Sequence, residues 1–212
     1  MIDVIIWGCG GHGREVCLIC ELAGVRVIGF LDERPEMKGQ VVDGIPVLGD
    51  IGDVPPAFRG RCEILCAGVA DPSVKKRFVA KTRQAGFPIA DTLVHPSVHI
   101  PKGNTLGKGC IVSAGATLTL NTTLGDFVII NRNVVVGHDA VIEDYATIAP
   151  MVVVGGHSTI GEGTFIGMGS SIREKITIGS WSCIGGGAFV KDSVPSNVLY
   201  AGVPARFKKN LA

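Results

Sequence analysis

The sequence predicts two architectures in succession: a Rossmann-like α/β half domain over residues 1–92 and a parallel β-helix over residues 93–212. Two observations carry this prediction. A glycine-rich turn follows an apolar segment near the N-terminus, and an aliphatic residue recurs at every sixth position through the second half of the chain. Neither the helical period of 3.6 residues nor the strand period of 2 residues explains such a repeat.

The six-residue repeat runs from Val94 to Val190 without a miss. A coil with three flat faces explains it, because one hexad per face places one aliphatic side chain inside the coil on each face. Residues 18 positions apart then lie on adjacent coils, roughly 4.8 Å apart. The aliphatic positions are Val94, Ile100, Leu106, Val112, Leu118, Leu124, Ile130, Val136, Ile142, Ile148, Val154, Ile160, Ile166, Ile172, Ile178, Ile184 and Val190.

Residues 1–92 alternate strand-like and helical segments, which is typical of a parallel sheet covered by helices. The segment around Gly44-Ile45-Pro46 is interpreted as irregular. The expected strands are 3–7, 25–31, 63–67 and 88–93, and the expected helices are 14–23 and 73–84.

The turn Gly8-Cys9-Gly10-Gly11-His12-Gly13 matches the G-x-G-x-x-G pattern, and Asp32 follows about 20 positions later. In such a turn, backbone amides at a helix N-terminus hold a pyrophosphate and the acidic residue holds a ribose. About 90 residues provide only one mononucleotide-binding half, which favours a nucleoside diphosphate attached to another group. The alternative is a tight structural turn without a ligand.

His138 and Asp139 are polar outliers on the outer surface of the predicted coils, and His157 follows Asp139 by 18 positions. A histidine beside a carboxylate is a candidate general base, because the carboxylate fixes the imidazole tautomer and raises its basicity. An inert surface pair is the alternative. Three converging imidazoles are not expected, since His95 and His99 lie more than two coils earlier, so we predict no metal.

The composition excludes several other classes of protein. The 20 Lys and Arg against 19 Asp and Glu, without a basic run, give no reason to expect nucleic acid or an anionic membrane as partner. No window reaches the roughly 18 apolar residues that membrane insertion needs. The seven cysteines are odd in number and lie among apolar neighbours, which predicts buried thiols in a reduced, cytoplasmic protein without a signal peptide.

The whole chain resembles the bacterial hexapeptide-repeat sugar acyltransferases, which include sialic acid O-acetyltransferases and N-acetyltransferases of nucleotide-linked amino-deoxy sugars. This resemblance implies left-handed coils, acetyl-CoA as cosubstrate and a homotrimer with the cofactor between neighbouring coils. The motifs that carry it are the glycine turn of residues 8–13, Phe30-Leu31-Asp32-Glu33, Ile130-Asn131 followed by His138-Asp139, and residues 200–205, Tyr-Ala-Gly-Val-Pro-Ala.

The resemblance also implies roles for individual residues. His138 would accept the proton of the acceptor, with Asp139 orienting it and Asn131 nearby. This chain has Asp139 where relatives often have Glu, and Thr147 where some have His. The nucleotide-sugar would contact Gly10, Gly11, His12, Asp32, Glu33 and Gly68. The acetyl-CoA groove would be lined by Thr147, Gly156, Met168 and Gly186.

The resulting hypothesis is direct transfer of acetyl from acetyl-CoA to the amino group of a nucleotide-linked amino-deoxy sugar, in the synthesis of a bacterial surface glycan. Backbone amides at Gly155 and Gly156 could hold the oxyanion. Because no cysteine shares the repeat register of His138, an acyl-enzyme has no evident nucleophile. The alternatives are O-acetylation of a sialic acid-type sugar and a catalytically silent assembly protein.

Overall fold

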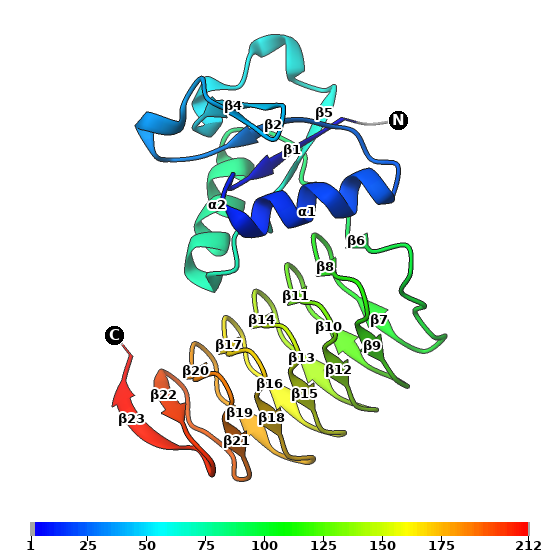
Figure 1. The fold of residues 1–212 in the computed structure, drawn as a ribbon, viewed down its shortest axis with the longest axis vertical. Helices are drawn as coiled ribbons and strands as arrows, with labels where there is room; N and C mark the ends of the chain where they lie inside the picture. The colour runs from blue at the N-terminus through cyan, green and yellow to red at the C-terminus, as the bar shows by residue number, and fades with distance from the viewer. Residues whose placement is uncertain (1–2, 212) are drawn as a thin grey trace.

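The computed structural model describes residues 3–211 and consists of an α/β unit seated on a three-sided parallel β-helix (Figure 1). The α/β unit contains a five-stranded sheet in the order β3-β4-β2-β1-β5, in which only β3 runs antiparallel to its neighbour. Its strands are β1 (Asp3–Trp7), β2 (Val27–Leu31), β3 (Val41–Val42), β4 (Ile45–Gly49) and β5 (Cys62–Leu65).

Two helices, α1 (Gly11–Leu22) and α2 (Pro72–Gln84), accompany this sheet. Helix α1 begins three residues before its expected start, because Gly10 is extended and acts as the N-cap. Asp71 caps α2 by accepting hydrogen bonds from two backbone amides, and Pro72 suits the first helical position. Three short 3-10 helices are η1 (Pro35–Met37), η2 (Ile51–Asp53) and η3 (Pro56–Phe58).

The segment expected to be irregular is in fact a hairpin whose second strand, β4, joins the sheet beside β2. Its turn is Asp43-Gly44, with φ of 49° and 80°. Two consecutive positive φ values give a turn whose twist matches the flanking strands. The Asp-Gly pair was therefore the sequence signal for this hairpin. Of the expected strand over 88–93, only a bridge between Ile64 and Ile89 joins the α/β sheet, and Leu93 instead begins β6 (Leu93–Val94) of the β-helix.

The β-helix has short strands on three faces, and strands on adjacent coils pair in parallel with a shift of 18 residues. Face 1 contains β7 (Thr105–Leu106), β10 (Thr123–Leu124), β13 (Val141–Ile142), β16 (Thr159–Ile160) and β19 (Thr177–Ile178). Face 2 contains β6 (Leu93–Val94), β8 (Ile111–Val112), β11 (Ile129–Ile130), β14 (Thr147–Ile148), β17 (Phe165–Ile166), β20 (Cys183–Ile184), β22 (Val198–Ala201) and β23 (Arg206–Asn210). Face 3 contains β9 (Thr117–Leu118), β12 (Val135–Val136), β15 (Val153–Val154), β18 (Ser171–Ile172) and β21 (Phe189–Val190).

The aliphatic repeat forms the interior of the prism, as predicted. From Val112 to Val190, every sixth residue is at most 3% exposed. The small residues at the corners are also buried, and several of them satisfy their hydroxyls on the next coil. Ser158 and Thr164, for example, donate to the carbonyls of Arg173 and Gly179. Among the described residues the buried hydroxyl of Thr122 is an exception, because it has no hydrogen-bond partner.

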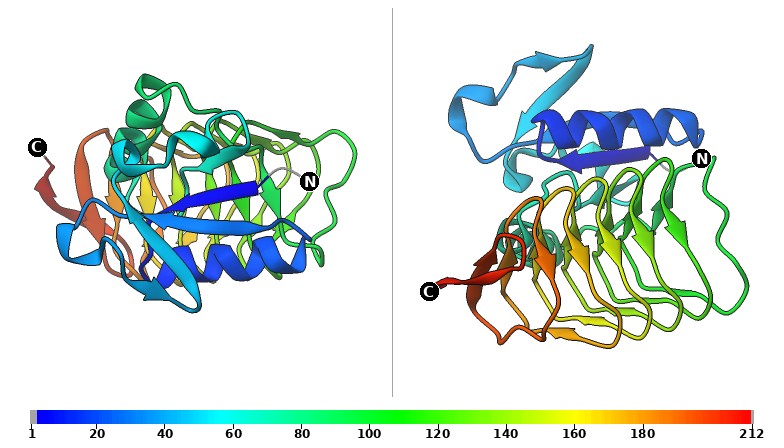
Figure 2. Two further views of the ribbon diagram at one scale, coloured as in Figure 1. Left: turned by 90° about the horizontal axis from the view of Figure 1, so that it is seen from above. Right: turned by 60° about the horizontal axis from the view of Figure 1, so that its bottom comes forward.

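The α/β unit covers face 2, and seen from above its sheet and α1 extend over the coils (Figure 2). Ile111 and Ile129 point outward from face 2 and are buried in a shared core with residues of the α/β unit. Ion pairs tie the two parts together at the rim, between Glu15 and Arg132 and between Lys76 and Glu162. Within residues 3–211, no helix is both long enough and apolar enough to cross a membrane.

Lys75 of α2 is fully buried where α2 meets face 2. Its Nζ donates to the carbonyl of Ala146 at 3.3 Å and to the hydroxyl of Thr147 at 3.1 Å. Burial lowers the pKa of Lys75 to about 7, because the ammonium form loses its hydration. The buried amine therefore links the α/β unit to the β-helix through hydrogen bonds.

This burial predicts a pH-dependent stability. The folded-state pKa of Lys75 lies below its unfolded value, so the unfolded chain binds more protons between about pH 7 and pH 10, and this residue's contribution to stability rises with pH. Relative to Lys75→Met, the free energy of unfolding of the wild type should increase by at most about 3 kcal/mol from pH 7 to pH 9.5. Urea unfolding of both proteins at the two pH values measures it. A difference that stays constant or shrinks would contradict the assignment.

Candidate active site

The predicted base lies at the corner between faces 3 and 1, hereafter corner 3–1. His138 Nδ1 is 2.8 Å from Asp139 Oδ2, and Asp139 Oδ1 accepts from Asn121 Nδ2 at 3.1 Å. The hydrogen bonds from His138 and Asn121 lower the pKa of Asp139, so this carboxylate is ionised near neutral pH. An ionised carboxylate only accepts, which places the proton of the neutral imidazole on Nδ1 and leaves Nε2 free to act as a base.

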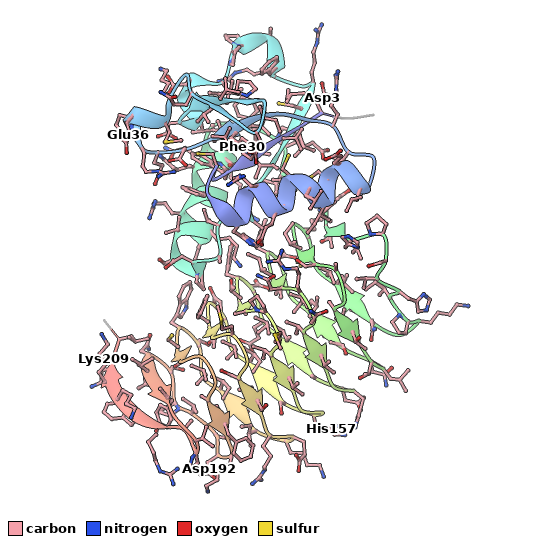
Figure 3. All side chains as sticks on the ribbon, viewed as in Figure 1. Asp3, Phe30, Glu36, His157, Asp192 and Lys209 are labelled. Carbon is pink, nitrogen blue, oxygen red and sulfur yellow. The ribbon has the colours of Figure 1, made fainter. Side chains whose placement is uncertain are left out.

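The structure adds His157 to this pair, in the column that the spacing predicted. Its backbone amide donates to the carbonyl of His138 at 2.9 Å, and its Nε2 lies 3.6 Å from Asp139 Oδ2. Asp139 and His157 both have φ of 57°, because each occupies the tight position of its corner. Figure 3 shows His157 on the edge of the β-helix that faces away from the α/β unit.

Gly156 lies one coil after His138, and its lack of a side chain makes room for the imidazole. A Cβ at position 156 would stand 2.8 Å from His138 Nε2 and 3.1 Å from Cδ2. Among the described residues, the Gly156 amide has no intramolecular acceptor, whereas the Gly155 amide donates to the carbonyl of Ile172. Of the two amides suggested for the oxyanion, only that of Gly156 is available.

The glycine turn after β1 contains glycines of two kinds. Gly8 and Gly13 permit close packing, since a Cβ on Gly13 would lie 1.8 Å from the carbonyl oxygen of Gly8. Gly68, which was expected to contact the nucleotide, is also a packing glycine. A Cβ added there would lie 2.0 Å from the carbonyl oxygen of Trp7. Gly10 and Gly11, in contrast, are exposed, and a Cβ there would meet no atom within 4 Å.

The exposed side of this turn opens into a groove of about 550 Å³, lined by Gly11, Arg14, Phe30 and Asp43 among others. His12 is mostly buried beside it, and burial lowers its pKa. Its Nε2 is inaccessible to solvent and has no hydrogen-bond partner within the described part of the chain. The N-terminus of α1 is therefore open at Gly10 and Gly11, whereas the unpaired Nε2 of His12 is enclosed behind them.

The two acidic residues after β2 are already engaged. Asp32 accepts from Arg34 Nε at 2.8 Å and from Cys9 Sγ at 3.0 Å. Burial alone would raise the pKa of Asp32, but the hydrogen bonds from Arg34 and Cys9 outweigh it and lower that pKa. Glu33 pairs with Arg77 and Lys81 of α2, at 2.6 Å and 2.9 Å. In this chain Glu33 therefore anchors α2 rather than presenting a free carboxylate.

Three further predicted site residues lie at the corner between faces 2 and 3, hereafter corner 2–3. Met168 is 65% exposed there, and Gly186 lies one coil after it. Asn131 is buried, and its side-chain oxygen accepts from the backbone amide of Arg132. The prediction that Asn131 lies near His138 is not met within the chain, because the whole of face 3 separates their two corners.

Thr147 is placed differently from its prediction. It points outward from face 2 but is only 1% exposed, because α2 covers it and Lys75 bonds to its hydroxyl. A residue buried in this interface cannot line an open cofactor groove, so the prediction for Thr147 is wrong for this chain. The signal that sequence reasoning missed is Lys75, a helical lysine whose partner lies 72 positions away.

One chain does not assemble these groups into a single site. The glycine turn lies on the side of corner 2–3, where Glu15 of α1 pairs with Arg132. His138 lies at corner 3–1 beside His157, which Figure 3 shows on the far side of the β-helix from the α/β unit. A reaction that uses both the glycine turn and His138 therefore needs a second copy of the chain.

A triangular β-helix with an outward His-Asp pair and a glycine turn ahead of it defines a hexapeptide-repeat acyltransferase. Family models agree: residues 3–82 match the PglD N-terminal domain, and residues 121–156 and 157–192 match the bacterial transferase hexapeptide. The chain belongs to the bacterial sugar acyltransferases that join these two parts, and its coils are accordingly left-handed.

Solved structures resemble the chain over nearly its whole length. A histidine mutant of perosamine N-acetyltransferase from Caulobacter crescentus, in complex with CoA and GDP-perosamine, is 29% identical, with a TM-score of 0.89 over 98% of this chain and 97% of that one. The acetyltransferase domain of PglB from Neisseria gonorrhoeae is 27% identical, with a TM-score of 0.89 over 98% and 100%. WeeI from Acinetobacter baumannii is 26% identical, with a TM-score of 0.81 over 98% and 100%. Comparison with curated protein sequences finds no match.

Proposed function

We propose that the protein transfers acetyl from acetyl-CoA to the amino group of a nucleotide-linked amino-deoxy sugar, in the synthesis of a bacterial surface glycan. One observation carries this proposal: an open glycine turn at a helix N-terminus and an exposed His-Asp pair occur together in a chain similar end to end to an enzyme solved with CoA and GDP-perosamine. Residues 1–92 would form the nucleotide-sugar-binding domain and residues 93–212 the acyltransferase domain.

In this proposal His138 Nε2 accepts a proton from the sugar amine as its nitrogen attacks the thioester carbonyl of acetyl-CoA. Asp139 holds Nδ1 and stabilises the imidazolium that forms, at the 2.8 Å contact already present. The free amide of Gly156 lies beside the imidazole and would donate to the oxyanion. Collapse of the tetrahedral intermediate expels the CoA thiolate, which takes up the proton, and no acyl-enzyme is needed.

The nucleotide-sugar would bind at Gly10, Gly11 and His12, with its pyrophosphate at the N-terminus of α1. The carboxylate of Asp32 already accepts from Arg34 and Cys9, so its role would be to fix the positions of these two side chains. Acetyl-CoA would lie along the coils between Gly156 of one subunit and Met168 and Gly186 of the next. Asn131, also at corner 2–3, would support the bound sugar from below the turn.

We further propose a homotrimer in which His138 of one subunit meets the glycine turn of its neighbour. Outward-facing Val135, Val153 and Phe189 on face 3 are each more than a third exposed, and such a stripe favours packing against another copy. Seven free cysteines fit a reducing compartment, and we place the enzyme in the cytoplasm.

Mixed trimers test the shared site. His138→Ala and Gly10→Leu each remove one half of a site and should each be inactive alone. Co-refolded in equal amounts, they should regain about a quarter of wild-type sites, because a random site then has one chance in four of two intact halves. The acetylated product measures the regain, and light scattering measures the mass. No regain from confirmed mixed trimers would place both halves in one subunit.

The choice between N- and O-acetylation is tested with matched acceptors. Acetyl transfer should be seen with a nucleotide-linked amino-deoxy sugar and be lost when a hydroxyl replaces the amine. Transfer to free sialic acid instead would favour the O-acetyltransferase alternative. Binding of nucleotide-sugars without any transfer would favour neither, and would contradict the proposed reaction.

A further inference from the structure

We propose that His138, Asp139 and His157 form a zinc-binding site, and that zinc bound there inhibits the enzyme. Their ligand atoms all lie within 4.8 Å of one another, on side chains that are exposed at corner 3–1. Two imidazoles and a carboxylate, with water in the fourth position, are a common ligand set for Zn²⁺. Zinc binding rests on this geometry alone, whereas its inhibitory effect rests on the proposed function of His138.

The contacts already present come close to those of a bound ion. Bonds of about 2.0–2.1 Å in a tetrahedral site set ligand atoms about 3.3 Å apart. His138 Nδ1 and His157 Nε2 lie 2.8 Å and 3.6 Å from Asp139 Oδ2. One separation must widen by about 0.5 Å and the other must shorten by about 0.3 Å to reach that geometry. Small rotations of the exposed side chains achieve both.

Backbone hydrogen bonds between coils hold His138, Asp139 and His157 in the arrangement that zinc binding requires. The Asp139 amide donates to the carbonyl of Leu120, and the His157 amide donates to the carbonyl of His138, both at 2.9 Å. The two imidazole rings lie edge to face with their centroids 5.0 Å apart. Because pairing between adjacent coils already fixes the Cα positions, zinc binding costs little backbone conformational entropy.

Zinc at this position would block the base directly. A neutral imidazole carries one proton and one lone pair. When Nδ1 of His138 binds the ion, the proton moves to Nε2, which then has no lone pair to accept the proton of the amine. The same ion also replaces the hydrogen bond from His138 to Asp139 that orients the ring.

His157→Asn tests the proposal, because it removes one ligand while leaving His138 and Asp139 in place. His99→Asn, which removes another exposed imidazole, is the matched control. Zinc chloride titrations by calorimetry, without thiol reductant, should give at least roughly tenfold weaker binding for His157→Asn and unchanged binding for His99→Asn. Cobalt(II) should give a tetrahedral visible spectrum with the wild type and lose it with His157→Asn.

Turnover is measured by chromatography of the acetylated sugar, since zinc also binds the CoA thiol. The turnover of each protein without zinc is the baseline against which its own inhibition is expressed. With zinc, inhibition of His157→Asn should be weaker by the same factor as its binding. Equal zinc affinity in wild type and His157→Asn, or inhibition that survives in the variant, would overturn the proposal. A wild type that binds zinc but transfers no acetyl would instead contradict the proposed function and leave the metal site standing.

Discussion

Replacing His138 by alanine should lower kcat by about 10²- to 10⁴-fold, which is the usual contribution of a positioned general base. The side chain is 58% exposed and, within residues 3–211, its hydrogen bond is to Asp139 alone, so the fold should be unaffected. The melting temperature should therefore change little, since surface substitutions usually alter stability by no more than about 0.5 kcal/mol. KM for the nucleotide-sugar should also stay near its wild-type value.

The measurement is acetylated product per active site under saturating acetyl-CoA, with His99→Ala as the control for loss of an exposed imidazole. His138→Asn keeps a hydrogen bond to Asp139 but has no titratable nitrogen, so it should be as slow as the alanine variant. Turnover within a factor of ten of the wild type in either variant would show that another group takes the proton.

The β-helix could be predicted from sequence because each face of its interior requires an aliphatic side chain at one fixed position. Every sixth side chain must be aliphatic to fill the prism, so the buried positions from Val112 to Val190 can be recognised from their spacing. The same register placed Asp139 and His157 in one column before any coordinates were considered. A local, repeated constraint of this kind can be recognised in the chain itself.

The parts that could not be predicted depend on contacts between distant segments. Thr147 has the same place in its hexad as exposed outward residues, and only the packing of α2 on face 2 buries it against Lys75. Glu33 looked like a ligand residue, but Arg77 and Lys81 of α2 occupy its carboxylate. The hairpin that ends in β4 is different, since its Asp43-Gly44 turn was present in the sequence and was overlooked.

Gly13→Ala should destabilise the protein severely, by about 3 kcal/mol or more, the upper range for forcing atoms into a packed interior. A Cβ there would lie 1.8 Å from the carbonyl oxygen of Gly8, and this backbone atom has no flexible end that can move aside. Helix α1 would have to lift from the end of β1, because the third glycine of this motif is what allows the close approach of helix and strand. Thermal unfolding of the variant should show a clear loss of stability.

Gly10→Ala is the matched control in the same turn, and it separates folding from binding. Gly10 has φ of −75° and ψ of −172°, which alanine adopts readily, and its Cβ would meet nothing within 4 Å. The variant should melt like the wild type but bind the nucleotide-sugar more weakly, because the methyl group stands where the pyrophosphate would approach the amides of α1. Calorimetric titration measures the affinity. If Gly10→Ala binds as well as the wild type while Gly13→Ala unfolds, the turn only packs α1 against β1, and the nucleotide must be held elsewhere.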